Sequence, residues 1–165
     1  MSEKNIPLYV ICENEFEKFS KQLDEFENSY LNSIGFSAKS KEIAKIPSKN
    51  GKVSKIIFGM GKEFNSQNFG IIGRVFDEGK YILETKITPQ NADDAILYFE
   101  LGKYFYDTFK TSPRKNIELI MPNANNEWGK KFANIINKGR DLVNSPTNIL
   151  GPDALAQKII ETGKE

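Results

Sequence analysis

GRDLVNSPTNILGPDALA, residues 139–156, has the pattern of a joint between two structural units near the end of a 165-residue chain. A helix runs into Asn144-Ser145-Pro146 and the chain then turns. Gly151-Pro152 begins another helix, because proline suits the first helical position. Nine residues follow Ala156. The chain therefore contains a joint and very little of whatever lies beyond it.

The composition narrows the function classes. A chain of 165 residues suits one domain with a sizeable core, in which roughly 70% of the unfolded surface is buried. The net charge of +1 provides no field to attract nucleic acid or an anionic membrane, so neither is expected as a partner. The complete lack of histidine excludes Ser-His-Asp and Cys-His catalysis and most zinc sites. Cys12 is the single cysteine, so we expect a buried structural thiol and no internal disulfide.

The start of the chain, MSEKNIPLYVICENEF, does not have the pattern of a signal peptide. Its apolar run is only about five residues long, and acidic residues follow at once. No stretch approaches the ~20 apolar residues that span a bilayer. The sequence therefore predicts a soluble, cytoplasmic protein.

Strand and helix patterns alternate along the chain. A charged segment with an apolar stripe at Phe16, Phe19, Leu23 and Phe26 predicts one or two helices over Glu13–Ile34. A turn around Asn50-Gly51 predicts an antiparallel hairpin. Residues 65–76 are weakly helical and interrupted by Gly70 and Gly73. The predicted strands are Ile6–Cys12, Lys41–Pro47, Val53–Phe58, Lys80–Ile87 and Asn116–Met121.

Two further helices complete the prediction. The first covers Thr88–Lys110 and packs on the sheet through Phe99, Gly102 and Tyr106, with the Tyr104–Tyr106 region in the core. Gly102 costs about 1 kcal/mol there relative to alanine, and a close helix–sheet contact would explain it. The second covers Glu127–Asn144, and Trp128 is expected in the core because of its helical spacing. The apolar residues on one side of this helix are Trp128, Phe132, Ile135, Gly139 and Leu142. The predicted fold class is α/β, a mixed central sheet flanked by helices.

Three groups of residues were considered as sites. Gly59-Met60-Gly61-Lys62 follows a strand, as phosphate-binding loops do, but it lacks the spacing of such loops and is better interpreted as a tight strand exit. Asp93-Asp94 near a helix start are better interpreted as partners of the helix dipole than as metal ligands. Lys52, Lys55 and Lys62 with Phe58 and Phe64 form a solvated face rather than a nucleic-acid site. No catalytic, cofactor-binding or metal-binding residue is predicted in this chain.

The joint carries a family resemblance. Arg140-Asp141-Leu142-Val143-Asn144-Ser145-Pro146, followed by Gly151-Pro152 and Leu155-Ala156, resembles the interdomain segment of leucyl (cytosol) aminopeptidases. That family carries an R-D-L-x-N-x-P run where its catalytic domain begins. The run from Phe99 to Phe105 is similar to the first seven positions of the family's W-x-L-G-x-Y-x-F, with Phe99 in place of Trp. Ile57–Gly61 and Gly79-Lys80-Tyr81 resemble two further steps of the same family.

The resemblance implies a domain organisation and a function. Residues 1–126 would form a macro-like amino-terminal α/β domain, 127–144 a linker helix, and 145–165 the start of a truncated catalytic domain. The parent would be a metallo-exopeptidase that removes N-terminal residues from peptides with two divalent ions, manganese or zinc. In the family, catalytic domains form the centre of a homo-hexamer. The signature N-T-D-A-E-G-R-L and the V-G-K-G run are both absent, so no catalytic or metal residue is carried over and this chain alone should be inactive.

On this resemblance, the chain's partners are its own catalytic domain, further copies of the parent and the parent's peptide substrates. Its role would be to organise the oligomer or to limit access to the active sites. Two alternatives stay open. One is a free-standing module that binds ADP-ribose, as macro-like folds often do, although fold alone does not establish function. The other is an interaction protein derived from a peptidase and lacking its catalytic half.

Overall fold

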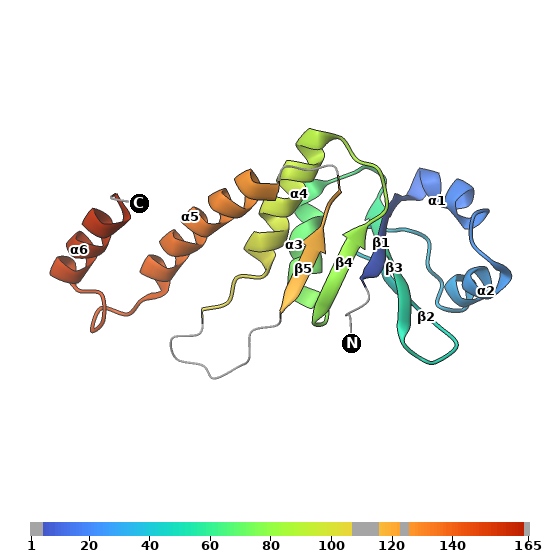
Figure 1. The fold of residues 1–165 in the computed structure, drawn as a ribbon, viewed down its shortest axis with the longest axis horizontal. Coiled ribbons are helices and arrows are strands. Elements are labelled where there is room, and N and C mark those ends of the chain that lie inside the picture. The colour runs from blue at the N-terminus through green and yellow to red at the C-terminus, as the bar shows by residue number, and fades with distance from the viewer. Residues whose placement is uncertain (1–4, 107–115, 123–125, 164–165) are drawn as a thin grey trace.

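The computed structural model describes residues 5–106, 116–122 and 126–163, which form five strands, six α-helices and a short 3-10 helix (Figure 1). The strands are β1 (Ile6–Cys12), β2 (Ile43–Pro47), β3 (Val53–Gly61), β4 (Gly79–Leu83) and β5 (Ile117–Ile120). The helices are α1 (Glu13–Ser20), α2 (Glu25–Ser33), η1 (Ser66–Asn68), α3 (Phe69–Val75), α4 (Pro89–Gly102), α5 (Asn126–Asn144) and α6 (Pro152–Thr162).

The five strands form one mixed sheet in the order β2-β3-β1-β4-β5. β1 pairs in parallel with β3 and β4, and β4 pairs in parallel with β5. β2 and β3 pair antiparallel, as the turn at Asn50-Gly51 predicted, and Gly51 adopts a positive φ of 78° there. A mixed α/β sheet flanked by helices is therefore confirmed.

The two faces of the sheet bury different side chains because strand residues alternate in direction. Val10 and Phe58 point to the face covered by α3 and α4, whereas Ile11 and Ile57 point to the face covered by α1 and α2. Figure 1 shows these two helical layers on opposite sides of the sheet. All four of these side chains are at most 5% exposed, so the apolar runs of β1 and β3 form the centre of both cores.

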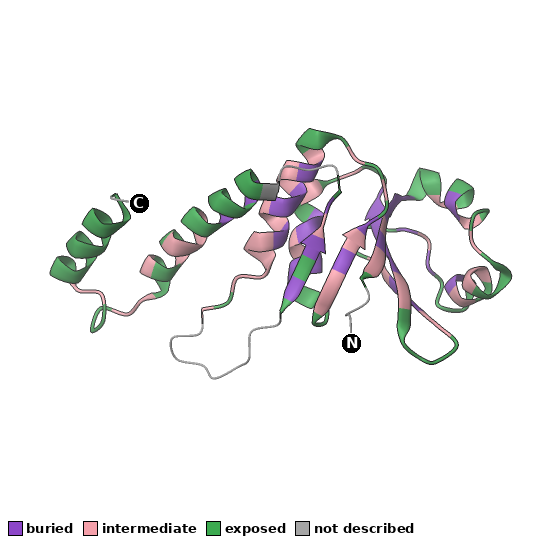
Figure 2. Cartoon of the chain, viewed as in Figure 1, coloured by how far each residue is buried: buried purple, intermediate pink, exposed green. Residues whose placement is uncertain are grey.

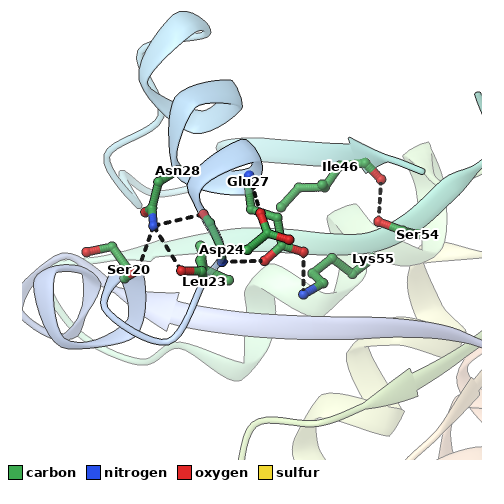
Figure 3. Close-up of polar contacts among 8 residues, drawn as sticks. All are labelled: Ser20, Leu23, Asp24, Glu27, Asn28, Ile46, Ser54 and Lys55. Atoms are coloured by element: carbon green, nitrogen blue, oxygen red, sulfur yellow. Dashed lines mark hydrogen bonds and ion pairs between the residues drawn. The ribbon is translucent and has the colours of Figure 1, made fainter. Parts of the chain in front are cut away.

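Polar contacts fix the corner between α1 and α2 to β3 (Figure 3). The Asn28 amide donates to the carbonyl oxygens of Ser20, Leu23 and Asp24 at 3.0, 3.2 and 3.1 Å. The Glu27 carboxylate lies 2.6 Å from the Lys55 ammonium, and these two side chains are only 12% and 24% exposed. The predicted helical segment 13–34 is therefore a pair of helices that an ion pair holds against the sheet.

Close contact between α3 and α4 explains three of the glycines. A Cβ on Gly102 would lie 1.9 Å from the Gly70 carbonyl oxygen, and one on Gly73 would lie 2.3 Å from that of Phe99. The expected helix–sheet contact at Gly102 is therefore wrong, because the glycine allows two helix backbones to touch. Gly70 and Gly73 do not interrupt α3, which runs through both of them.

Several predicted boundaries differ from the structure. α4 ends at Gly102 rather than Lys110, and residues 107–110 lie outside the described part. The prediction that the Tyr104–Tyr106 region is in the core is wrong, because the chain has left the helix there and Tyr106 is only half-buried. β4 ends at Leu83 rather than Ile87, and β3 continues to Gly61. Phe26, predicted on the apolar stripe, is 58% exposed, because α1 and α2 are separate helices whose apolar sides need not align.

The prediction that Trp128 is a core residue is wrong. Trp128 and Phe132 on α5 are 47% and 46% exposed, and their rings stack at 5.2 Å between centroids. The side of α5 that meets α4 carries the small residues Gly129 and Ala133 instead. Figure 2 shows how much of α5 and α6 is exposed, with α6 far from the sheet. Large apolar side chains on α5 are thus turned away from the domain's own core.

Candidate interdomain joint

The Gly59-Met60-Gly61-Lys62 segment is a strand exit that another piece of backbone crosses. The Gly61 N–H donates to the Ala38 carbonyl at 3.0 Å, and the Lys41 N–H donates to that of Gly59 at 2.9 Å. A Cβ on Gly59 would lie 2.2 Å from the Lys39 carbonyl oxygen. These glycines are needed because the backbone of residues 38–41 lies directly against them, and the Gly61 N–H, which a phosphate-binding loop would offer to its ligand, already donates to Ala38.

The carboxyl end of β1 is the edge where open α/β sheets bind ligands. Cys12 ends β1 there and is 9% exposed. Burial raises the pKa of the Cys12 thiol, and the nearby carboxylates of Glu15, Glu13 and Glu63 raise it further. A negative field of this kind opposes the phosphates of a ligand such as ADP-ribose. The electrostatics of this edge therefore count against the nucleotide-binding alternative.

The lysine and aromatic residues of the third candidate group differ in burial and in their partners. Phe58 is fully buried and Lys55 pairs with Glu27, whereas Lys52 and Lys62 are exposed. No single surface joins these lysines to the aromatic rings. Asp93 and Asp94 lie within α4 but beyond its first turn, which holds no acidic residue, so the prediction that they are partners of the helix dipole is wrong. The Asp94 carboxylate accepts a 3.4 Å hydrogen bond from Gln90.

In the described ranges, no three of the histidine, cysteine, aspartate and glutamate side chains come together in a way that fits a metal ion.

The strongest arrangement of polar side chains lies where α5 joins the rest of the domain. α5 first docks on α4 at Gly129, where an added Cβ would lie 2.9 Å from the Asp93 carbonyl oxygen and the Leu97 nitrogen. Ala133, one turn further on, is 1% exposed. Small residues therefore bring the two helix backbones into contact over the first half of α5.

The second half of α5 is held by side chains from the Arg140–Asn144 part of the family motif. The Arg140 guanidinium donates to the Leu101 carbonyl at 3.1 Å and lies 5.3 Å from the centre of the Tyr104 ring. The Tyr104 hydroxyl donates to Asp141 at 2.8 Å and accepts from the Asn144 amide at 3.0 Å. Three of the motif's side chains thus grip the segment that leaves α4. We call this set of contacts the clasp: Leu101, Tyr104, Arg140, Asp141 and Asn144.

The contacts of the clasp position α5 on the domain. Burial raises the pKa of the Tyr104 phenol; Asn144 lowers it, Asp141 raises it and Arg140 lowers it. A phenol held in its protonated form keeps its donor for Asp141. Next to the clasp, the Tyr106 and Ser145 hydroxyls lie 3.2 Å apart, which continues the contact past the end of α5. These contacts fix the direction in which α5 leaves the domain.

An apolar stripe follows the free side of α5 and continues on α6. On α5, Ile135 is 62% exposed and Val143 is 85% exposed, in addition to the stacked pair at Trp128 and Phe132. On α6, where every residue from Pro152 to Thr162 is exposed, Leu155, Ile159 and Ile160 are 37%, 59% and 53% exposed. Several large apolar side chains exposed on the same helices are more than the scattered single residues of an ordinary surface, and they indicate an interaction site.

Sequence reasoning found part of this joint. The resemblance placed Arg140, Asp141 and Asn144 at an interdomain segment, but nothing in the sequence paired them with Tyr104. The regular spacing of aromatic residues after Gly102 predicted a longer α4. Because α4 ends at Gly102, Tyr104 lies beyond the helix, where it can contact α5. A tyrosine shortly after a helix-ending glycine is the local signal that could have pointed to this contact.

These features define a class of protein: an α/β domain with an attached long helix that exposes large apolar side chains. The chain belongs to the family described as the M17 aminopeptidase N-terminal domain, whose model matches residues 6–122. It is 34% identical over 91 residues to a probable cytosol aminopeptidase of Rhizobium johnstonii, and the match covers 47% of this chain and 18% of that protein. The family recognised from the joint is therefore confirmed.

Solved structures show the same fold. A cytosol aminopeptidase from Coxiella burnetii matches 99% of this chain with a TM-score of 0.88 and 22% identity, over 36% of its own length. The bottromycin maturation enzyme BotP in complex with Mn matches 95% of this chain with a TM-score of 0.69 and 19% identity, over 35% of its length. Tomato leucine aminopeptidase, in a mutant form, matches 94% of this chain with a TM-score of 0.67 and 17% identity, over 38% of its own length. The chain thus spans about a third of the solved proteins it resembles.

Among the described helices, none is long and apolar enough to cross a membrane.

Proposed function

We propose that this chain is the non-catalytic amino-terminal domain of a leucyl aminopeptidase and that the apolar stripe on α5 and α6 packs against an M17 catalytic domain. Membership of the N-terminal domain family supports the assignment. The observation that carries the proposal is the stripe itself. A surface helix of a globular domain usually carries polar residues on the side that faces solvent. On α5 the stacked Trp128 and Phe132 are exposed instead.

The division of labour follows the organisation that the resemblance implies. Residues 1–126 form the head, 127–144 the linker helix, and 145–165 the start of the catalytic domain. The two divalent ions, manganese or zinc, and the catalytic residues belong to that catalytic domain, where they polarise a peptide carbonyl and activate water. The head organises a hexamer of the parent or limits access of peptides to its active sites, in the cytoplasm.

The energetics of the stripe support a docking role. Burial of each large apolar side chain stabilises an interface by roughly 1.5–3 kcal/mol before ordering costs. At least seven such side chains are exposed in the stripe: Trp128, Phe132, Ile135, Val143, Leu155, Ile159 and Ile160. A catalytic domain that covers even half of them would bind the head strongly.

The test separates activity from docking. The chain alone, incubated with a leucine anilide and added manganese or zinc, is expected to give no turnover. The chain mixed with an M17 catalytic domain from the same genome, or produced in one polypeptide with it, is expected to form a complex that hydrolyses the anilide. Turnover in proportion to the concentration of the isolated chain would refute the non-catalytic assignment.

A pair of variants tests the docking surface. Phe132→Glu places a charge in the middle of the stripe and is expected to weaken association with the catalytic domain at least tenfold, which is about 1.4 kcal/mol. Val53→Glu is the control, because Val53 is 37% exposed at the start of β3, away from the stripe. Equal binding by the two variants would show that the stripe is not the interface.

A further inference from the structure

The outer edge of β2 is one of the two edges of the sheet. β2 comes first in the strand order, so within the described residues its outer side has no neighbouring strand. The Ser54 hydroxyl donates to the Ile46 carbonyl at 3.0 Å (Figure 3), and the Gly59 N–H donates to the Glu42 carbonyl at 2.8 Å. Even-numbered residues of this segment therefore bond inward, toward β3.

Backbone groups alternate in direction along an antiparallel strand. The backbone groups of Glu42, Ala44 and Ile46 are directed toward β3. The backbone N–H and carbonyl groups of Ile43 and Lys45 are therefore directed away from β3, toward the open edge of the sheet. Lys41 has a positive φ of 71° and Pro47 has no N–H. The usable edge is thus limited to residues 43–45, and it offers two donors and two acceptors.

Apolar side chains flank this edge on both layers. A hollow of about 530 Å³ runs along it, with Tyr30, Ile34 and Phe36 contributed from one side and Val75 from the other. Ile34 is 47% exposed and Val75 is 43% exposed. A strand added to the edge would therefore find apolar contacts on both faces of the extended sheet.

We propose that the edge pairs with the β2 edge of a second copy of this chain, antiparallel, with Ala44 opposite Ala44 of that copy. In this register Ile43 of each copy lies opposite Lys45 of the other copy. Each of these two pairs exchanges two backbone hydrogen bonds, which gives four in all. The register centred on Lys45 opposes two lysines and loses a donor at Pro47. The register centred on Ile43 requires Lys41 to be extended, which its left-handed backbone forbids.

The charges at the edge fit this register. Lys45 is paired with Asp77 at 2.5 Å, and Glu42 accepts from the Ser37 and Lys39 backbone N–H groups at 2.9 and 3.0 Å. With Ala44 at the centre, Lys45 lies opposite Ile43 and not opposite a like charge. The twofold axis keeps Ile34 of both copies on one face and Val75 of both on the other. A second copy thus supplies apolar cover that a lone peptide strand does not.

The experiment is sedimentation equilibrium of the full chain over a wide concentration range, since dimerisation follows mass action. The wild-type chain is expected to show a reversible monomer–dimer equilibrium. Lys45→Pro removes one outward donor on each copy and leaves the inner ladder intact, so it is expected to be monomeric. Proline is tolerated on an edge strand where its N–H would face solvent. Lys45→Ala keeps the backbone donor and is expected to dimerise.

A second pair of variants keeps the proposal testable if Lys45→Pro does not fold, as judged by circular dichroism. Ile34→Glu brings two like charges together beside the paired edges and is expected to abolish the dimer. Ile159→Glu on α6 is the matched control and is expected to retain it. A wild-type chain that stays monomeric overturns the proposal. So does a dimer that survives Lys45→Pro or Ile34→Glu, or one that only Ile159→Glu disrupts.

Discussion

Gly102→Ala tests the packing of α3 on α4 most directly. The added methyl group would lie 1.9 Å from the Gly70 carbonyl oxygen and 2.6 Å from its carbonyl carbon. Both are backbone atoms of a helix, so no side-chain rotation can relieve the clash. The two helices must separate, and this loosens the contact over the buried Phe69, Ile72 and Phe99.

The magnitude follows from two opposing terms. Alanine gains about 1 kcal/mol over glycine inside a helix. Overpacking a close contact costs about 1–3 kcal/mol, and a backbone clash belongs at the upper end of that range. The net loss is about 2 kcal/mol. For a domain of this length each kcal/mol shifts Tm by about 2–4 °C, so the variant is expected to melt about 4–8 °C below the wild type.

Gly139→Ala is the matched control because it is the same change in another helix. Around a Cβ at Gly139 in α5, no described atom lies within 4 Å. Only the helix-propensity gain remains, so this variant is expected to melt about 2–4 °C above the wild type. Thermal melts followed by circular dichroism measure both. A Gly102→Ala chain that melts at or above the wild-type temperature would refute the helix–helix contact.

Three further changes probe the clasp, the helical corner and the response to pH. Tyr104→Phe removes both hydrogen bonds of the phenol and is expected to cost less than about 1 kcal/mol, yet to speed amide hydrogen exchange over residues 137–145; Tyr98→Phe on α4 is expected to leave that exchange unchanged. Glu27→Gln keeps the cap of α2 but removes the charge beside Lys55, and is expected to cost about 1–2 kcal/mol in urea denaturation, between the values for surface and buried pairs. If the cost is nil, the ion pair does not hold the corner. Folding raises the pKa of the Cys12 thiol and of the Tyr81 and Tyr104 phenols above their ordinary values of 9.0 and 10.0. The stability that these three groups contribute is therefore complete below those values and falls as the pH rises above them. Urea midpoints measured from pH 8 to 11 should decline accordingly, and a rise would contradict the burial of Cys12 and Tyr81.

Short-range patterns were enough to predict most of the sheet. Runs of branched apolar residues marked β1 and β3, and Asn50-Gly51 marked the hairpin, because each of these signals depends on the residue's own backbone preferences. Thr88-Pro89 likewise marked the start of α4, where the Thr88 side chain accepts from the Asn91 N–H at 3.3 Å. The α/β class followed from the order of these local elements.

The sequence did not reveal which surfaces meet. Gly102 was recognised as a close contact, but glycine reports only that something approaches and not what approaches. Phe105 continues the apolar spacing of α4, yet it is 38% exposed because the chain has left the helix. Trp128 has the spacing of a core residue and lies on the surface of the domain. In each case the missing information is tertiary, since periodicity cannot identify the partner that covers a face.

The two sides of α5 show why that partner is needed. Trp128 is followed directly by Gly129, and Phe132 by Ala133, so each large residue lies about 100° around the helix from a small one. The small residues bring α5 against α4, and the aromatic residues are turned aside and stay half exposed. A helix that served this domain alone would have no reason to carry a second apolar face, because solvent disfavours it. The clasp at Arg140 and Tyr104 fixes the angle of α5, and hence the direction in which that second face points. A helix built in this way is suited to belong to two cores at once, with its small side in this domain and its aromatic side in the one proposed to follow.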